Sequence, residues 1–273
     1  MRLPTVLLCL VVGLATLTTS CGRPGDHAAR PTLSIPVSTA PVQRLSQPQQ
    51  KAVAGPVDPD KRVGAIFLNG ASLHVCTGSV VHSASGSLVM TAAHCLAGAS
   101  QLAFVPGFAG DAAPTEVWKA DAVYLDPRWI ASKDPRADYA IARVNNPAGG
   151  SVESHVGLAL TLGTAPPPGS HVTVLGYPAG VGGSPIGCPA STSVNESGFP
   201  SLVCEGLVDG TSGAPWVSGT MLTGLIGGFE RGGCAANVSY SAPFDEQTAQ
   251  LLARADAGGP GDTVPNDLDD SCR

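Results

Sequence analysis

The stretch Thr91-Ala92-Ala93-His94-Cys95 decides how this chain is interpreted, because two further short motifs follow it. Asp138-Tyr139-Ala140-Ile141 supplies an aspartate, and Gly210-Thr211-Ser212-Gly213-Ala214-Pro215 supplies a serine between glycines. A serine hydroxyl is a poor nucleophile until a base removes its proton, and a histidine does this best when a buried carboxylate holds it in one tautomer. The three motifs together predict acyl-transfer chemistry.

Ser212 is the predicted nucleophile of this set. The glycines on either side allow a tight turn, in which the backbone N–H groups of Gly210 and Ser212 can point at one spot and form an oxyanion hole. His94 is the predicted general base and acid, since histidine titrates near neutral pH. A serine in a glycine-rich surface loop is common, so the prediction depends on all three motifs occurring together.

Asp138 is the predicted orienting carboxylate, because it directly precedes an apolar strand-like segment at 139–144 that would bury it. Asp126 and Asp134 are its rivals, since each also lies between the histidine and serine motifs. Only Asp138 opens a strand with the pattern Asp-x-Ala-hydrophobic, which is typical of the family that the chain resembles, named below, and we therefore favour it.

Short strand-like segments separated by Gly, Pro, Asn and Ser occupy the chain from Val63 onward. Such spacing predicts a β-barrel or β-sandwich. One helix is expected at Asp245–Ala255, capped by Asp245 and with an apolar side made of Ala249, Leu251 and Leu252. The expected strands are Val63–Leu68, Ser79–His82, Ser87–Thr91, Leu102–Val105, Glu116–Leu125, Tyr139–Val144, His171–Leu175, Leu202–Cys204, Trp216–Val217 and Met221–Ile226.

Together with Cys76-Thr77-Gly78-Ser79-Val80-Val81, Gly176-Tyr177-Pro178 and Gly224-Leu225-Ile226-Gly227-Gly228, these motifs resemble those of the trypsin-like, chymotrypsin-fold serine peptidases. The resemblance runs from near Val63 to about Ala255. It implies an all-β fold of two six-stranded antiparallel β-barrels with a C-terminal helix. The separation of 74 positions between Asp138 and Ser212 is compact and favours the bacterial secreted, glutamyl-endopeptidase-like branch.

Two residues depart from the family pattern. Thr211 stands where digestive members carry an aspartate that pairs with a new amino terminus, so Arg62-Val63-Gly64 is not expected to be an activation site. Ala214 replaces the usual glycine, and its methyl group requires an ordinary φ in the turn.

Cys21 aside, six cysteines lie between the signal region and the end of the chain, which in an exported protein indicates disulfides. The resemblance implies a bridge between Cys76 and Cys95 around the histidine loop. For the rest, Cys188–Cys204 is favoured over Cys204–Cys234, with Cys234 and Cys272 either paired or free. No short Cys-x-x-Cys or paired histidine spacing occurs, so no metal site is expected, and the mechanism needs no cofactor.

Residues 1–20 have the pattern of an export signal, with Arg2 before an apolar run and small residues before Cys21. Cys21 is a candidate for lipidation, which would tether the protein to a membrane, and ordinary cleavage nearby is the alternative. The protein is therefore expected to be secreted or to lie on the outer face of a bacterial cell membrane. The formal net charge of −6 argues against nucleic acid as a partner.

The chain is expected to divide into a signal peptide at 1–20, a flexible linker or short propeptide at 21–60, a peptidase domain at 61–256 and a disordered acidic tail at 257–273. The resemblance implies that Glu205–Asp209 and Gly227–Arg231, with Tyr240 and Ser241 nearby, line the substrate pocket. Asp209 could anchor a basic side chain or be a solvated turn residue.

The predicted function is that of an exported serine endopeptidase acting on protein or peptide substrates, as a monomer. The main alternative is a catalytically silent binding protein of the cell envelope with the same fold. An esterase with the same triad and a structural lipoprotein are further alternatives.

Overall fold

The strands of the first half of the chain close into a barrel in the computed structural model, which describes residues 51–235 and 237–266. The strand order β10-β3-β2-β5-β6-β7-β4 is joined into a ring by the pairing of β3 with β4. Its strands are β2 (Val63–Leu68), β3 (Leu73–Val81), β4 (Leu88–Thr91), β5 (Leu102–Pro106), β6 (Trp118–Leu125) and β7 (Ala140–Asn145), with β10 (Gly180–Val181) added to β3.

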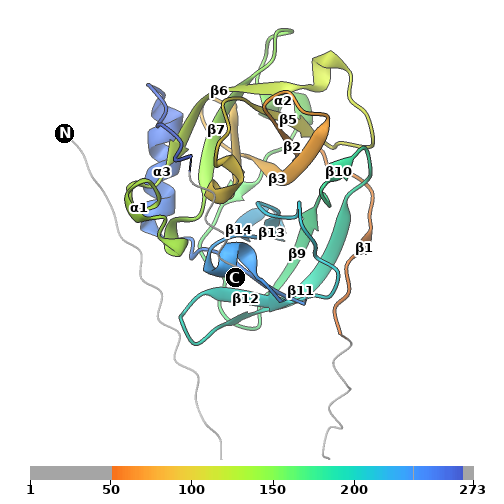
Figure 1. Cartoon of the computed structure of the whole chain (residues 1–273), viewed down its shortest axis with the longest axis vertical. Coiled ribbons are helices and arrows are strands. Elements are labelled where there is room, and N and C mark those ends of the chain that lie inside the picture. The colour runs from red at the N-terminus through yellow and green to blue at the C-terminus, as the bar shows by residue number, and fades with distance from the viewer. Residues whose placement is uncertain (1–50, 236, 267–273) are drawn as a thin grey trace, which may run out of the picture. The chain divides into compact units, whose positions relative to one another are not determined.

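The strands of the second half form a curled sheet of order β15-β12-β11-β9-β13-β14-β8, to which β1 adds through β11 (Figure 1). All its neighbours are antiparallel except β14 and β8, which are parallel. The strands are β1 (Gly55–Pro56), β8 (Thr161–Leu162), β9 (His171–Gly176), β11 (Ile186–Val194), β12 (Pro200–Val203), β13 (Pro215–Ser218), β14 (Met221–Leu225) and β15 (Val238–Tyr240). The expected all-β, chymotrypsin-like architecture is confirmed.

Each half has its own apolar core. Large side chains such as Ile66, Phe104 and Ile141 fill the closed barrel without exposure to solvent. Val174 and Trp216 are likewise fully buried in the curled sheet. Burying side chains of this size stabilises a fold by about 1.5–3 kcal/mol each, so the two cores form a rigid frame for the segments between them.

The helix α3 (Glu246–Ala257) begins where the sequence predicted, at a capping box. The side chain of Asp245 accepts hydrogen bonds from the backbone N–H groups of Gln247 and Thr248, at 3.0 and 3.3 Å. The buried face consists of Thr248, Leu251 and Ala255, whereas Ala249 is exposed, so the expected apolar side was only partly right. In Figure 1 this helix lies beside β6 and β7 of the first barrel.

Shorter helices occupy connections that the sequence analysis left as loops. They are α1 (Pro127–Ser132), α2 (Val152–Val156) and the 3-10 helices η1 (Ala93–Leu96), η2 (Pro114–Glu116), η3 (Pro135–Ala137) and η4 (Phe229–Gly232). Three of these carry predicted site residues at or near their ends.

Residues 51–60, which the sequence analysis assigned to a flexible linker, lie along the second sheet. Gly55 and Pro56 pair with β11. The N–H of Ala54 donates to Glu205 O at 2.7 Å, and the N–H of Glu205 donates to Ala52 O at 2.9 Å. The peptidase unit therefore includes this segment. The signal region and Cys21 fall outside the described residues.

The first part of the expected acidic tail is also packed. The N–H of Asp262 donates to Val123 O at 2.7 Å, and its carboxylate accepts from Leu125 N–H at 2.7 Å and pairs with Arg254. A Cβ at Gly261 would approach the backbone of β6 too closely, which explains why glycine occupies this position. The non-helical segment that follows α3, up to residue 266, thus packs along the first barrel.

Candidate active site

His94 and Ser212 line one pocket of about 950 Å³. His94 lies in η1, immediately after β4 of the first barrel. Ser212 lies in the connection between β12 and β13 of the second sheet. The histidine and serine motifs are far apart in the sequence, but the fold brings them together, because each half of the molecule contributes one side of the pocket.

Asp138 is bonded directly to His94. One carboxylate oxygen, Oδ2, lies 2.8 Å from His94 Nδ1, and the other, Oδ1, accepts from the His94 backbone N–H at 2.9 Å. Oδ2 also accepts from the backbone N–H of Gly228 at 2.8 Å. The Asp138 residue is 1% exposed, so the two oxygens are satisfied entirely by protein donors.

The charge state of this carboxylate determines the histidine tautomer. Burial alone would raise the pKa of Asp138, but the charge of His94 and the hydrogen bonds from His94 and Gly228 outweigh burial, so the pKa lies below its ordinary value. An ionised carboxylate can only accept hydrogen bonds. His94 must therefore carry a proton on Nδ1, which leaves Nε2 available as a base in the neutral ring.

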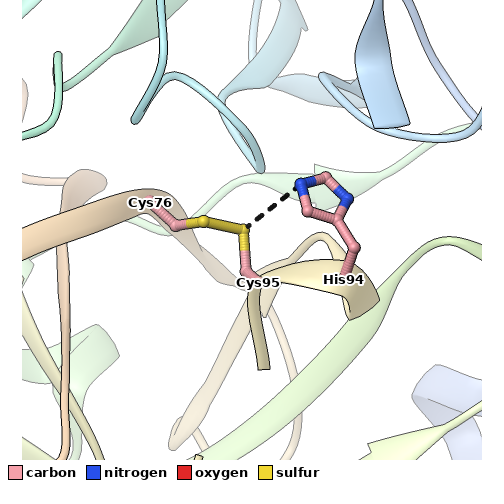
Figure 2. Close-up of side chains that lie close together, drawn as sticks. All are labelled: Cys76, His94 and Cys95. Carbon is pink, nitrogen blue, oxygen red and sulfur yellow. Dashed lines mark hydrogen bonds between the residues drawn. A yellow bond between two sulfur atoms is a disulfide. The ribbon is translucent and has the colours of Figure 1, made fainter. Parts of the chain in front are cut away.

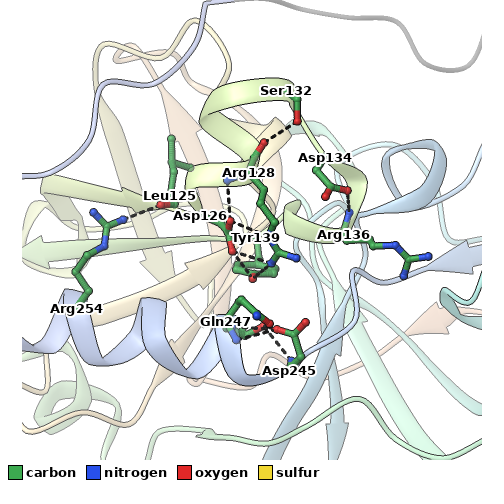
Figure 3. Close-up of polar contacts among 11 residues, drawn as sticks. Leu125, Asp126, Arg128, Ser132, Asp134, Arg136, Tyr139, Asp245, Gln247 and Arg254 are labelled. Carbon is green, nitrogen blue, oxygen red and sulfur yellow. Dashed lines mark hydrogen bonds and ion pairs between the residues drawn. The ribbon is translucent and has the colours of Figure 1, made fainter.

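The two rival aspartates have other partners. Asp126 is 4% exposed and pairs with the Arg128 guanidinium at 2.8 Å, and its Oδ2 accepts from the hydroxyl of Tyr139 at 2.8 Å (Figure 3). Asp134 caps η3 by accepting from the N–H of Arg136 at 2.9 Å. Both thus hold the segment that ends at Asp138 and do not contact His94.

The disulfide Cys76–Cys95 lies beside the histidine, as expected from the resemblance. Figure 2 shows the His94 ring next to it, with Nε2 3.9 Å from Cys95 Sγ. These three residues are close enough to suggest a metal site. However, metals bind thiolates, and both sulfurs are consumed in the disulfide, so this cluster fixes the position of η1 and is not a metal centre.

The second expected disulfide, Cys188–Cys204, is also present and joins β11 to the end of β12. The alternative Cys204–Cys234 pairing is therefore wrong. Cys234 is itself disulfide-bonded. Cys272, which was expected to be either its partner or free, lies outside the described residues.

Residues Asp209–Gly213, named here the oxyanion turn, require glycine at two positions. Gly210 has φ +91° and Gly213 has φ +80°. A Cβ at Gly210 would clash with the backbone of Ala179, and one at Gly213 with the carbonyl of Thr77. The oxyanion turn can therefore lie this close to Ala179 and to Thr77 only because Gly210 and Gly213 have no side chains.

The direction of the Gly210 N–H follows from the carbonyl group of the same peptide. The Asp209 carbonyl accepts from Ala179 N–H at 2.8 Å. In a trans peptide, the C=O and the N–H point in opposite directions, so the Gly210 N–H points away from Ala179. It has no hydrogen-bond acceptor within residues 51–235 and 237–266, and Gly210 lines the pocket.

The Ser212 N–H is placed in the same manner. The Thr211 carbonyl accepts from Ala214 N–H at 2.8 Å, which turns the Ser212 N–H to the other side of the peptide. This N–H also lacks an acceptor in the described part of the chain. Two unpaired N–H groups on either side of one peptide unit can bind an oxyanion.

The Ser212 hydroxyl and the His94 ring share the pocket but form no hydrogen bond with one another in this structure. In enzymes without substrate, such bonds are often long and shorten only in the complex. The structure thus joins two of the three predicted triad residues directly and places the third at the same pocket.

Thr211 and Ala214 both fit the turn. The Thr211 hydroxyl donates to Val208 O at 2.7 Å, and the residue is 3% exposed. Ala214 is fully buried and is not among the non-glycine residues of positive φ, so its methyl group causes no backbone strain. A Cβ at Gly176 would lie 3.0 Å from that methyl carbon, which indicates that a glycine opposite makes room for it.

The pocket walls agree in part with the sequence analysis. Glu205–Asp209 form one wall, and Glu230 and Arg231 contribute to the other, but Tyr240 and Ser241 do not line the pocket. The second wall also includes Gly233, Ala235 and Val238, which sequence reasoning missed. The run from Glu230 to Gly233 has positive φ throughout, and the Gly-Gly pair at its end is the one sequence signal of this sharp bend.

Comparison with known proteins agrees with this architecture. The model of the trypsin-like peptidase domain matches residues 76–225. No curated protein matches the chain. Among solved structures, the protease Anisep from Arthrobacter nicotinovorans is similar at 26% identity and a TM-score of 0.65, over 76% of this chain and 100% of that one.

Two other solved structures are similar. The thermostable serine protease AL20 from an extremophilic microorganism is 25% identical, with a TM-score of 0.63, over 73% of this chain and 99% of its own. A Glu endopeptidase matches at 15% identity and a TM-score of 0.61, over 77% of this chain and 99% of its own. At this identity, the match shows a shared fold alone. Because the family model spans more than half of the 273 residues, the chain belongs to the trypsin-like peptidase family and has the chymotrypsin-like fold of its serine proteases.

Proposed function

We propose that this protein is an exported serine-type endopeptidase that hydrolyses peptide bonds through an acyl-enzyme on Ser212. The observation that carries the proposal is the bonding of Asp138 to His94, beside two unpaired N–H groups at the same pocket. Two further pockets in the described part of the chain, of about 710 and 440 Å³, are lined by no histidine.

The first half of the reaction forms the acyl-enzyme. Ser212 Oγ attacks the carbonyl carbon of the scissile bond while His94 Nε2 takes its proton, and the carbonyl oxygen becomes an oxyanion bound by the N–H groups of Gly210 and Ser212. The imidazolium then gives the proton to the amine nitrogen, the C–N bond breaks and the amine product leaves. Asp138 stabilises the imidazolium throughout and keeps its own charge.

The second half repeats these steps with water. His94 takes a proton from a water molecule, whose oxygen attacks the acyl carbon, and the same two N–H groups bind the second oxyanion. When the ester bond to Ser212 breaks, His94 returns the proton to Oγ. The products are a carboxylic acid and the free enzyme.

The proposal of export rests on the sequence of residues 1–20 and on disulfide bonds, which persist in oxidising compartments. Lipidation of Cys21, location on the outer face of a bacterial membrane and a monomeric state are proposed on the same basis. No helix within residues 51–235 and 237–266 is long and apolar enough to cross a membrane. The branch within the family is likewise proposed, from the compact spacing of Asp138 and Ser212.

The test is hydrolysis of a mixed peptide library by the wild type, by Ser212→Ala and by His94→Ala, with Ser218→Ala as a control at an exposed serine of β13. The wild type and the control should cleave, and the two site variants should lose about 10⁴-fold or more in kcat. A folded wild type that cleaves no peptide would instead support a silent binding protein of this fold.

A further inference from the structure

One side chain from the first barrel bonds to the oxyanion turn of the second. Of the three carbonyl groups whose directions define this turn, those of Asp209 and Thr211 accept from backbone N–H groups. The carbonyl of Gly210 instead accepts from the hydroxyl of Thr77, Oγ1 to O, at 3.0 Å. The residues are 133 positions apart in the chain, so this bond ties the turn to β3.

Thr77 is fully buried, and each of its polar groups is used. Its N–H donates to Ser212 O at 2.8 Å, and its carbonyl accepts from the Thr91 hydroxyl at 2.7 Å. Its hydroxyl oxygen accepts from Tyr177 N–H at 2.9 Å. The residue thus touches the nucleophile, the strand that leads to His94 and the loop that supports Gly210.

The hydroxyl proton of Thr77 has a single destination. A hydroxyl has one hydrogen to donate, and the Tyr177 N–H already donates to this oxygen, so the hydrogen is directed at Gly210 O. Both groups lie where water does not compete, and a buried hydrogen bond of this kind orients its partner strongly. Thr77 therefore holds the carbonyl end of the Gly210–Thr211 peptide.

Side chains inside the turn do not provide this restraint. The N–H and the hydroxyl of Thr211 both donate to Val208 O, at 3.1 and 2.7 Å, and this acceptor lies only three residues before Thr211, so both bonds move with the turn. Gly210 has φ +91° and no side chain, which leaves its backbone free to rotate when nothing outside holds it. The Gly210–Thr211 peptide joins the peptide that carries the Gly210 N–H to the one that carries the Ser212 N–H. An external bond to Gly210 O therefore holds these two donors at a fixed angle to one another.

We infer that Thr77 is a positioning residue for the oxyanion hole, acting through its hydroxyl on the Gly210 carbonyl. The inference rests on the proposed function, because it assigns a role in stabilising the oxyanion. Loss of the hydroxyl frees the carbonyl end of the Gly210–Thr211 peptide, which changes the angle between the Gly210 and Ser212 N–H groups. Transition-state stabilisation then weakens, while the pocket walls that bind substrate stay in place. The effect falls on kcat and leaves KM nearly unchanged.

The test compares Thr77→Val, which keeps the shape of the side chain and removes the hydroxyl, with Thr77→Ser, which keeps the hydroxyl. Thr223→Val is the matched control, since Thr223 is buried and donates its hydroxyl to Trp216 O at 3.0 Å, away from the pocket. Each variant of the full chain is assayed for kcat and KM on a peptide cleaved by the wild type, with near-ultraviolet circular dichroism to verify folding.

Thr77→Val should lower kcat by about 10–100-fold, somewhat less than the loss of an oxyanion donor itself, with KM within about twofold. Thr77→Ser should recover kcat to within about threefold of the wild type, and Thr223→Val should retain it although it loses a comparable hydrogen bond. If Thr77→Val does not fold, Thr77→Ala carries the same expectation.

An active wild type with an equally active Thr77→Val or Thr77→Ala variant overturns the inference and leaves the proposed function intact. So does an equal loss of kcat in Thr223→Val, because the effect would then be general destabilisation. A folded wild type that neither cleaves peptides nor reacts with a serine-directed probe overturns the proposed function itself.

Discussion

Asp138 Oδ2 accepts a hydrogen bond from the backbone N–H of Gly228 at 2.8 Å, in addition to its bond with His94. Asp138 lies two residues before β7 of the first barrel, and Gly228 follows β14 of the second sheet. The carboxylate therefore links the two halves of the molecule at the point where His94 is oriented. A change in this group should affect both the histidine and the position of the second sheet.

Replacing Asp138 with Asn should lower kcat by about 10⁴-fold, because an amide can donate to Nδ1 and stabilise the wrong tautomer of His94. The measurement is kcat for a peptide substrate at neutral pH, with folding verified by circular dichroism. Asp134→Asn is the control, since Asp134 caps η3 and does not contact His94. Substantial activity in a folded Asp138→Asn protein would remove Asp138 from the triad.

Asp126→Asn should reduce the free energy of unfolding by about 2 kcal/mol at pH 7. The substitution removes the charge that pairs with Arg128 and replaces Oδ2, which accepts from Arg128 and from the Tyr139 hydroxyl, with an amide donor. Burial would raise the pKa of Asp126, but the bonds from Arg128 and Tyr139 outweigh it and hold the pKa below its ordinary value. A lowered pKa in the folded state stabilises the fold above the ordinary pKa, and this contribution disappears as the pH falls through the folded-state pKa.

The difference in stability between the wild type and Asp126→Asn should therefore shrink in acid, below about pH 4. Urea unfolding at pH 7 and pH 3 measures it. Asp121→Asn is a surface control, since Asp121 pairs with Arg143 while about half exposed, and should cost at most about 1 kcal/mol. A difference that grows in acid would contradict the assignment of an ionised Asp126.

Ala54→Pro should destabilise the wall of the pocket, because it removes the N–H that donates to Glu205 O. We expect a loss of about 1 kcal/mol in unfolding free energy and a rise in KM for peptides. Ala52→Pro is the matched control, since the Ala52 N–H has no acceptor in the described part of the chain and only its carbonyl is used. Equal effects of the two prolines would show that the bond to Glu205 is not what matters.

Asp209→Asn should reduce cleavage of peptides with a lysine or arginine near the scissile bond by about two- to fivefold, the range for an exposed charge pair. Asp209 is exposed, lines the pocket beside Ser212 and has no partner for its carboxylate within residues 51–235 and 237–266. Matched peptides with glutamine in place of lysine measure the preference. An unchanged ratio would make Asp209 a solvated turn residue.

Much of the fold could be predicted from local sequence signals. The strands expected at 79–82 and 87–91 correspond to the end of β3 and to β4, which pair with one another, and Asp245 was identified as a cap before α3. β11 was missed because Ile186–Val194 contains small polar residues and Pro189. On one edge of β11, residues 186–187 pair with β1 and residues 192–194 pair with β12. Pro189 lies between these two paired stretches, where the N–H that proline lacks is not needed.

The candidate site was predictable only where a motif marks it. His94, Asp138 and Ser212 lie in recognisable contexts, whereas Thr77 is a threonine in a strand whose role depends on a partner 133 residues away. The packing of residues 51–60 was missed for a similar reason, since a composition rich in small residues gives no sign that a backbone pairs with Glu205. Contacts between distant backbone groups leave no periodicity in sequence.

The most direct test of the account is reaction of the folded protein, with its disulfides intact, with a fluorophosphonate, followed by mass-spectrometric location of the adduct. The reagent phosphonylates a serine only when a base activates it and an oxyanion hole binds the new P–O group. The proposed triad predicts one adduct, on Ser212, that is absent from Ser212→Ala and strongly slowed in His94→Ala. A folded protein that stays unlabelled, or one labelled at another serine, would contradict it.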